Sequence, residues 1–194
     1  VKAGPSRRKH RTPPFHLTPF PERDHSDTLE QGDAELLPEF IDLVEAGVVK
    51  QWQDNTLFAT LYYRQTEHVI NRVNTIYNDT ILNRIYTNAG NAEALGAELG
   101  ITFLPATWCR LNAGANIYRY RISGQLFGDD INTSNTIFSI NAQSTFTLHP
   151  TWTLQLGLNY LSERVTAQGT DSRFFNPSLT LRKSFLDDRL SIVL

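Results

Sequence analysis

Apolar and polar residues alternate with a period of two through most of the chain after residue 38. In residues 109–118, apolar side chains occupy the odd positions, and Arg, Asn, Gly and Tyr occupy the even positions. The same alternation recurs over residues 56–63, 95–103, 138–148, 152–160 and 178–185. Successive side chains of a β-strand point to opposite faces of the sheet, so this period is typical of a strand with one apolar and one polar face. The sequence therefore predicts an all-β chain, with about seven full strands after residue 39 and a truncated last one.

The predicted connections alternate between tight and long. Tight turns are expected at residues 53–55, 105–107, 149–151 and 187–188, and long connections near residues 76–91, 123–135 and 165–173. Residues 12–37 belong with the long ones as a Pro-rich loop, because proline fixes φ and removes a ladder donor. An antiparallel up-and-down meander with every tight turn at one edge produces this rhythm.

Each of the three tryptophans stands beside a predicted tight turn: Trp52, Trp108 and Trp152. A soluble sheet gives tryptophan no reason to mark one edge. At a membrane–water interface the amphipathic indole ring settles at headgroup level, so the three residues are expected to form an interface girdle. The sequence therefore favours the wall of a transmembrane β-barrel with lipid on its apolar face.

Composition fits this interpretation and narrows the classes of function. Hydrophobic residues make up 40% of the chain and charged residues 20%, which is too apolar for a disordered chain. The formal net charge is −2, and we expect no nucleic-acid partner even though residues 7–11 form a basic cluster. A strand end at the lumen or rim of the barrel is the simpler interpretation of that cluster. The chain is not expected to be an enzyme, and no catalytic, cofactor-binding or metal-binding residues are predicted.

The polar face of the predicted wall supplies the candidate functional residues. These side chains share the polar parity of their strands and are expected to face the lumen. They are Glu45, Glu98, Arg110, Asn112, Asn116, Asn141, Gln143, Gln155, Asn159 and Arg182. Pairing with one another, or with a plug inside the barrel, is the default role for the charged members.

Several segments resemble TonB-dependent outer-membrane receptors. Residues 32–39 (GDAELLPE) are similar to the "G-N-P-x-L-x-P-E" segment before a late barrel strand of that family. Residues 56–64 (TLFATLYYR) resemble the next strand, and residues 88–99 resemble an "N-x-G … G-x-E-L" strand. The closest resemblance is to the C-terminal barrel portion of receptors of the Bacteroidota type.

The resemblance implies part of a barrel in the cell outer membrane that takes up a metal chelate or a glycan. It also implies three partners: outer-membrane lipid, a plug domain, and the energy-transducing protein TonB. With short segments at both ends, residues 1–194 are expected to form a curved sheet that is open or poorly sealed. Two other functions remain open from the residues alone. One is a small stand-alone barrel acting as an anchor or adhesin, and the other is a soluble β-sheet binding module.

Overall fold

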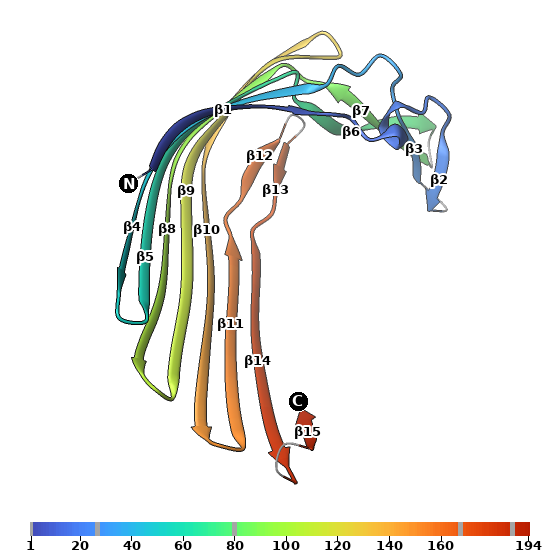
Figure 1. Ribbon diagram of the computed structural model, residues 1–194. Coiled ribbons are helices and arrows are strands. Elements are labelled where there is room, and N and C mark those ends of the chain that lie inside the picture. The colour runs from blue at the N-terminus through green and yellow to red at the C-terminus, as the bar shows by residue number, and fades with distance from the viewer. Residues whose placement is uncertain (1, 26–27, 79–80, 167–168, 187–188) are drawn as a thin grey trace.

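The computed structural model describes residues 2–25, 28–78, 81–166, 169–186 and 189–194. Nine antiparallel strands form the main sheet, called the wall below (Figure 1). Their order across the wall is β1 (Lys2–His10), β4 (Glu39–Trp52), β5 (Asn55–Glu67), β8 (Asn91–Ala106), β9 (Cys109–Leu126), β10 (Asp129–His149), β11 (Trp152–Leu161), β14 (Phe174–Phe185) and β15 (Leu190–Val193). The predicted all-β antiparallel meander is therefore confirmed. Among the described residues, no helix is long and apolar enough to cross a membrane.

The tight turns join consecutive wall strands at one end, which is the lower end in Figure 1. Residues 53–54, 107–108 and 150–151 separate β4 from β5, β8 from β9 and β10 from β11. The turn predicted at residues 187–188 lies outside the described residues. We call this end of the wall the tight-turn end and the opposite end the hairpin end.

The connection near residues 123–135, predicted to be long, is a tight turn between two long strands. β9 ends at Leu126 and β10 begins at Asp129. Phe127 and Gly128 both have positive φ, 54° and 92°, as two-residue hairpin turns require. A positive φ is uncommon for phenylalanine, so the sequence did not signal this turn. The two strands consequently have 18 and 21 residues, well beyond the 9–11 that cross a membrane.

The other long connections form paired strands at the hairpin end. Residues 76–91 contain most of the hairpin of β6 (Ile70–Asn78) and β7 (Ile81–Asn88), and residues 165–173 contain most of that of β12 (Arg164–Thr166) and β13 (Gly169–Asp171). Residues 12–37, predicted as one loop, hold the 3-10 helix η1 (Pro14–Leu17) and the strands β2 (Glu22–His25) and β3 (Thr28–Gln31). β3 pairs in parallel with β7. The partner strand lies some fifty residues away, so local sequence could not reveal this pairing.

A four-stranded sheet in the order β2-β3-β7-β6 therefore forms beside the wall. Figure 1 shows it projecting from the hairpin end over the concave side of the wall. The wall itself is curved and open, with β1 and β15 at its two edges. We call this smaller sheet the cap sheet.

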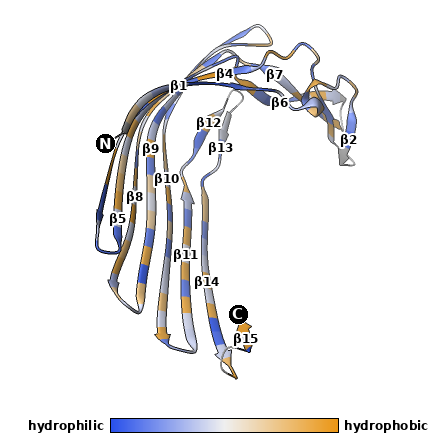
Figure 2. Ribbon diagram, in the orientation of Figure 1, coloured by the Kyte–Doolittle hydropathy of each residue, from blue (hydrophilic) through white to orange (hydrophobic). Residues whose placement is uncertain are grey.

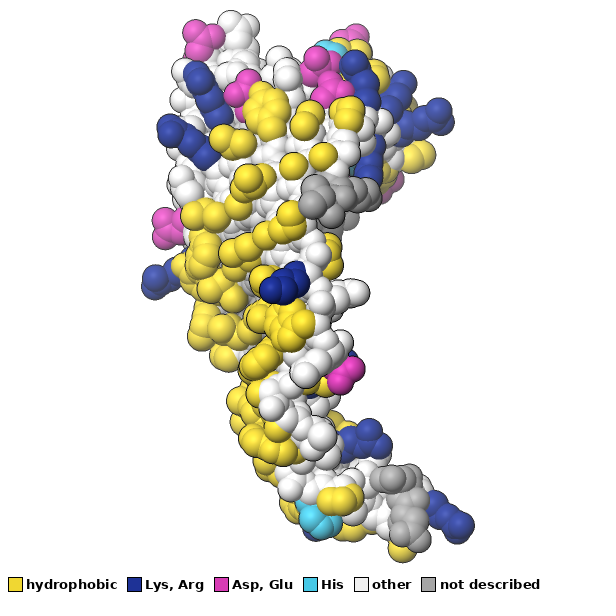
Figure 3. Space-filling model, turned by 60° about the vertical axis from the view of Figure 1, so that its left-hand side comes forward, with side chains coloured by type: hydrophobic (Ala, Val, Ile, Leu, Met, Phe, Trp, Pro, Cys, Tyr) yellow, Lys and Arg dark blue, Asp and Glu magenta, His cyan; other side chains and the backbone are white. Residues whose placement is uncertain are grey.

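The two faces of the wall differ in polarity, as the alternating colours along the strands in Figure 2 show. Exposed apolar side chains cover the middle of the convex face, and charged side chains gather toward the hairpin end (Figure 3). On β9 the convex row is apolar from Cys109 to Ile117 and then continues with Arg119 and Arg121. A convex face that meets lipid over its middle and water beyond it has this pattern.

The concave face also changes polarity beyond this point on β9, but from polar to apolar. Beyond Tyr118 its side chains become apolar and bury themselves under the β6–β7 hairpin. The resulting core comprises Val69, Val73, Ala89, Ala92, Ile122, Leu126 and Ile131, with Ile85 and Tyr120 packed against it. Val73 and Ile122 are each only 1% exposed. This core fixes the cap sheet to the wall, so the cap sheet is an integral part of the fold.

Candidate functional site

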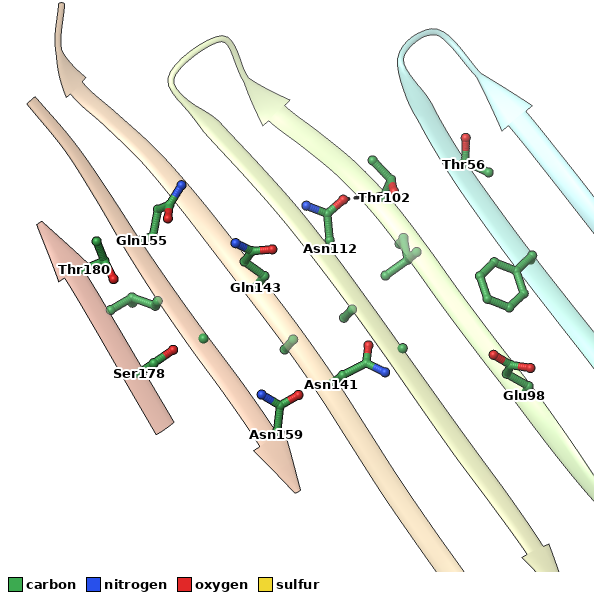
Figure 4. Close-up of a pocket in the computed structure, with 17 residues that line it drawn as sticks. Thr56, Glu98, Thr102, Asn112, Asn141, Gln143, Gln155, Asn159, Ser178 and Thr180 are labelled. Carbon is green, nitrogen blue, oxygen red and sulfur yellow. Dashed lines mark hydrogen bonds between the residues drawn. The ribbon is translucent and has the colours of Figure 1, made fainter. Parts of the chain in front are cut away.

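A cavity of about 600 Å³ lies against the concave face of the wall, which we call the concave cavity (Figure 4). Five neighbouring strands, β5, β8, β9, β10 and β11, and the adjoining β14 contribute its lining. Its polar side chains carry mainly amide and hydroxyl groups: Thr56, Glu98, Thr102, Asn112, Asn141, Gln143, Gln155, Asn159, Ser178 and Thr180. This composition suits hydrated solute or a polar protein surface.

The register of the strands places the amide side chains in rows across the wall. Asn112 on β9 stands directly opposite Gln143 on β10. One step along, Asn141 on β10 stands opposite Asn159 on β11. The hydroxyl of Thr102 donates to Oδ1 of Asn112 over 3.1 Å, which extends the first row onto β8. Such rows present both donors and acceptors to the cavity.

Glycines on β8 allow aromatic rings to lie close to the sheet. A Cβ added at Gly100 would collide with the ring of Phe58, and one at Gly96 would stand 2.7 Å from the hydroxyl of Tyr62. That hydroxyl donates to Oδ1 of Asn116 over 3.0 Å. The rings of β5 therefore lie across β8, and the Phe58 ring lines one side of the concave cavity.

The structure brings six of the ten predicted lumen-facing residues together. The lining of the concave cavity includes Glu98, Asn112, Asn141, Gln143, Gln155 and Asn159. Glu45 lines an adjoining hollow of about 390 Å³ that it shares with Glu98. Asn116 lies beside Glu98 on the next strand and is bound by Tyr62.

The two predicted arginines lie on the same polar parity but nearer the tight-turn end. Arg110 stands opposite Thr145, and Arg182 stands opposite Thr153. Neither belongs to the lining of the concave cavity. Their position near the last turns separates them from the amide rows.

All three tryptophans lie at the tight-turn end. Trp52 ends β4, Trp108 lies in the turn between β8 and β9, and Trp152 begins β11. The Trp108 ring has its centroid 6.2 Å from that of Phe146, and Nζ of Lys183 lies 4.5 Å from the centroid of the Trp152 ring. A lysine above an indole ring is favourable at a polar–apolar boundary.

Sequence reasoning missed Phe58 and Tyr62 as parts of this site. Both stand on the polar parity of β5, among Thr56, Thr60 and Arg64. The available signal was the pair of glycines on β8, because glycine in a strand often marks a close approach by another group. Among the described residues, no group of three or more His, Cys, Asp or Glu side chains is placed to hold a metal ion.

Comparison with protein families assigns the whole chain to one family. The model of the outer membrane protein beta-barrel family matches residues 1–194. The chain belongs to this family. It is an outer-membrane protein, and its apolar convex face is the surface that such a barrel turns to lipid. Outer-membrane barrels have short periplasmic turns and longer extracellular loops, so the hairpin end and its cap sheet are the extracellular end.

Two solved receptor structures share the fold. The siderophore receptor PirA from Pseudomonas aeruginosa aligns with 95% of this chain at a TM-score of 0.60 and 12% sequence identity. A G324V mutant of the ferric enterobactin receptor PfeA from Pseudomonas aeruginosa aligns with 95% at a TM-score of 0.56 and 15% identity. The chain spans about a third of the length of these receptors, 33% and 30% respectively. A search of curated proteins returned no significant match.

Proposed function

We propose that this chain forms part of the barrel wall of a TonB-dependent receptor that actively imports a metal chelate or a glycan. The concave cavity supports this proposal most directly. Its wide polar lining stands behind an apolar convex face, which is the arrangement needed to pass a hydrophilic solute through a lipid bilayer.

A plug domain and TonB are the partners that this function requires. An open curved wall leaves its concave face uncovered, and a polar plug surface fits the rows of amide groups there. Amides donate and accept hydrogen bonds without carrying charge, so a plug held by them can be displaced without separating ion pairs. The likeness of the fold to a siderophore receptor and a ferric enterobactin receptor supports the assignment to an importing receptor.

We assign transport rather than catalysis to the concave cavity. Uncharged amides and hydroxyls dominate its polar lining, and they bind hydrated solutes or protein backbone without activating a nucleophile.

Uptake by the complete receptor in a strain lacking the native gene tests the proposal. Radiolabelled ferric chelates and radiolabelled oligosaccharides are offered to energised cells and to cells treated with a protonophore. We expect one class of solute to accumulate only in energised cells, and accumulation to be lost in a TonB-deficient strain. Uptake that is insensitive to both treatments would contradict active transport.

A pair of variants on β10 tests whether solute uptake depends on the concave cavity. Asn141→Leu combined with Gln143→Leu removes two amides from the concave cavity, whereas Ser144→Leu, next to Gln143 in sequence and opposite Leu111 on the convex row, lies outside the cavity lining. We expect the first to reduce uptake and the second to leave it unchanged, with both receptors reaching the outer membrane in equal amounts. Equal uptake by the two variants would remove the concave cavity from the transport path.

A further inference from the structure

A second polar hollow lies at the extracellular end, between the β6–β7 hairpin of the cap sheet and the β12–β13 hairpin. Its volume is about 450 Å³, within the range of small-molecule sites. Arginines from both hairpins line it: Arg72 on β6, Arg84 on β7 and Arg164 on β12. Asp171 on β13 is the acidic residue of this lining, so the formal charge of the lining is 3 − 1 = +2. We call this hollow the extracellular cleft.

The cap sheet holds two of these arginines on one face. Arg72 stands opposite Tyr86, and Arg84 lies two residues before Tyr86 on the same strand. The two arginines are therefore diagonal neighbours on one side of the hairpin. The hydroxyl of Tyr86 donates to Oε1 of Glu30 over 2.6 Å, which places one carboxylate on this face of the cap sheet. Glu30 is not part of the cleft lining.

The β12–β13 hairpin supplies the third arginine from the opposite side. Nε of Arg164 donates to Oδ2 of Asp171 across the hairpin over 2.7 Å. A guanidinium has five N–H donors, and this bond uses one of them. Contacts with β10 position the hairpin. The amide of Asn135 donates to the carbonyl of Glu163 over 3.2 Å, and the backbone N–H of Phe138 donates to Oγ of Ser162 over 2.9 Å.

Asn71, next to Arg72 on β6, also borders the extracellular cleft. It has the strand parity of the core residue Val73, whereas Arg72 and Arg84 share the other face of the hairpin. The charge offered to the cleft therefore comes from the arginines.

We propose that the extracellular cleft binds an anionic group of the incoming solute, a carboxylate or a phosphate. Planar guanidinium groups on two separate hairpins form a fork that matches the oxygens of such a group. The β12–β13 hairpin, which lines the cleft, lies on the concave side of the wall toward the hairpin end (Figure 1), so the cleft selects anionic solutes ahead of the concave cavity. This inference rests on the proposed function only in assigning the anion to a transported solute.

Calorimetric titration of the complete receptor in detergent, at about 50 mM salt to limit screening, tests the cleft. The probes are citrate, pyrophosphate and the neutral sugar maltotriose. We expect citrate or pyrophosphate to bind, with affinity falling as salt is raised, and maltotriose to leave the cleft empty. The absence of binding by both anions would overturn the proposal.

Two variants on different hairpins identify the site. Arg72→Gln on β6 and Arg164→Gln on β12 should each weaken anion binding by about tenfold or more, because each removes a charge-assisted contact. Arg182→Gln, an arginine far from the cleft at the other end of the wall, should bind as the unaltered receptor does. Because the two hairpins are separate, parallel losses in variants with unaltered β-sheet circular dichroism exclude the collapse of one hairpin as the cause. Unchanged affinity in both variants would refute the site.

A competition experiment distinguishes the two possible sources of a bound phosphate group, which are a transported solute and a lipid. Lipid A added to the pyrophosphate complex should not displace the probe, because the cleft lies on the concave side away from the lipid-facing surface. Displacement by lipid A would assign the cleft to lipid and overturn its assignment to a solute. Anion binding in detergent does not depend on energised uptake, so failure of the transport assay and failure of this titration are distinguishable.

Discussion

Replacing Leu156 with arginine tests which face of the wall meets lipid. Leu156 lies midway along the convex row of β11, four residues from both Trp152 and Tyr160, and its side chain is 40% exposed. The row from Trp152 to Tyr160 covers 160 − 152 = 8 steps of about 3.3 Å, or about 26 Å along the strand. A tilt of roughly 40° reduces this to about 20 Å across the membrane, close to the apolar band of about 25 Å in outer-membrane barrels. Leu156 therefore lies near the bilayer midplane.

An arginine at the midplane of a barrel's lipid face costs about 2–4 kcal/mol. At about 1.4 kcal/mol per tenfold change, Leu156→Arg should lower the folding equilibrium constant by a factor of about thirty to nearly a thousand. Gln155→Arg is the matched control, since Gln155 is adjacent in sequence, has the opposite parity on β11 and stands in the polar row opposite Thr180, whereas Leu156 stands opposite Leu179. A charge placed in a hydrated cavity keeps its water, so the control should cost far less.

The free energy of unfolding of both variants in lipid vesicles, measured by urea titration with tryptophan fluorescence, checks this difference. Outer-membrane abundance in cells provides a second measurement. The result that would refute the reasoning is an equal loss in the two variants. It would mean that the faces are assigned wrongly or that neither meets lipid.

Three further predictions concern the two ends of the wall. Gly90→Ala should destabilise the extracellular end by about 1–3 kcal/mol, measured by denaturant titration, because Gly90 has φ of +97° and an added Cβ would collide with the carbonyl of Ser123. The pKa of Tyr86 is raised by burial and then by its hydrogen bond to Glu30, so its contribution to stability is complete below about pH 10 and is lost as the pH rises further. Unfolding midpoints of the native protein and Tyr86→Phe should therefore show a smaller alkaline decline in the variant. Trp152→Ala should cost about 1 kcal/mol of stability in vesicles by removing the ring beneath a lysine ammonium, and an equal cost in detergent micelles without a headgroup region would contradict the girdle.

The wall was predictable because its signal is local. In each strand, every second residue is apolar and identifies the convex face, as Cys109 to Ile117 on β9 do. The tryptophans beside three of the tight turns mark the tight-turn end. The amide rows of the concave cavity follow from the same parity once neighbouring strands pair in register. Sequence could therefore supply six lining residues without any knowledge of distances.

The extracellular end was not predictable because its structure depends on distant partners. β3 is only four residues long and pairs with β7, so Glu30 meets Arg84 through a contact that no local pattern encodes. The polarity change beyond Tyr118 weakens the alternation in the part of β9 that leaves the membrane. Phe127 occupies a turn position at which an Asn-Gly pair would have indicated a hairpin. These features explain why the arginines of the extracellular cleft are not among the residues predicted from the sequence.

The polarity change on β9 gives a final prediction about where the membrane ends. Convex side chains are apolar through Ile117, whereas Arg121, four residues further on the same face, belongs to water. The chain has one cysteine, Cys109, so Cys109→Ser gives a background on which single cysteines can be placed.

In that background, Arg121→Cys should react rapidly with a membrane-impermeant maleimide added to intact cells. Ala115→Cys, on the same convex row within the apolar belt, should react far more slowly, because lipid excludes both the reagent and the thiolate that it needs. If Ala115→Cys reacted as fast as Arg121→Cys, the convex belt would face water and the boundary drawn at Ile117 would be wrong.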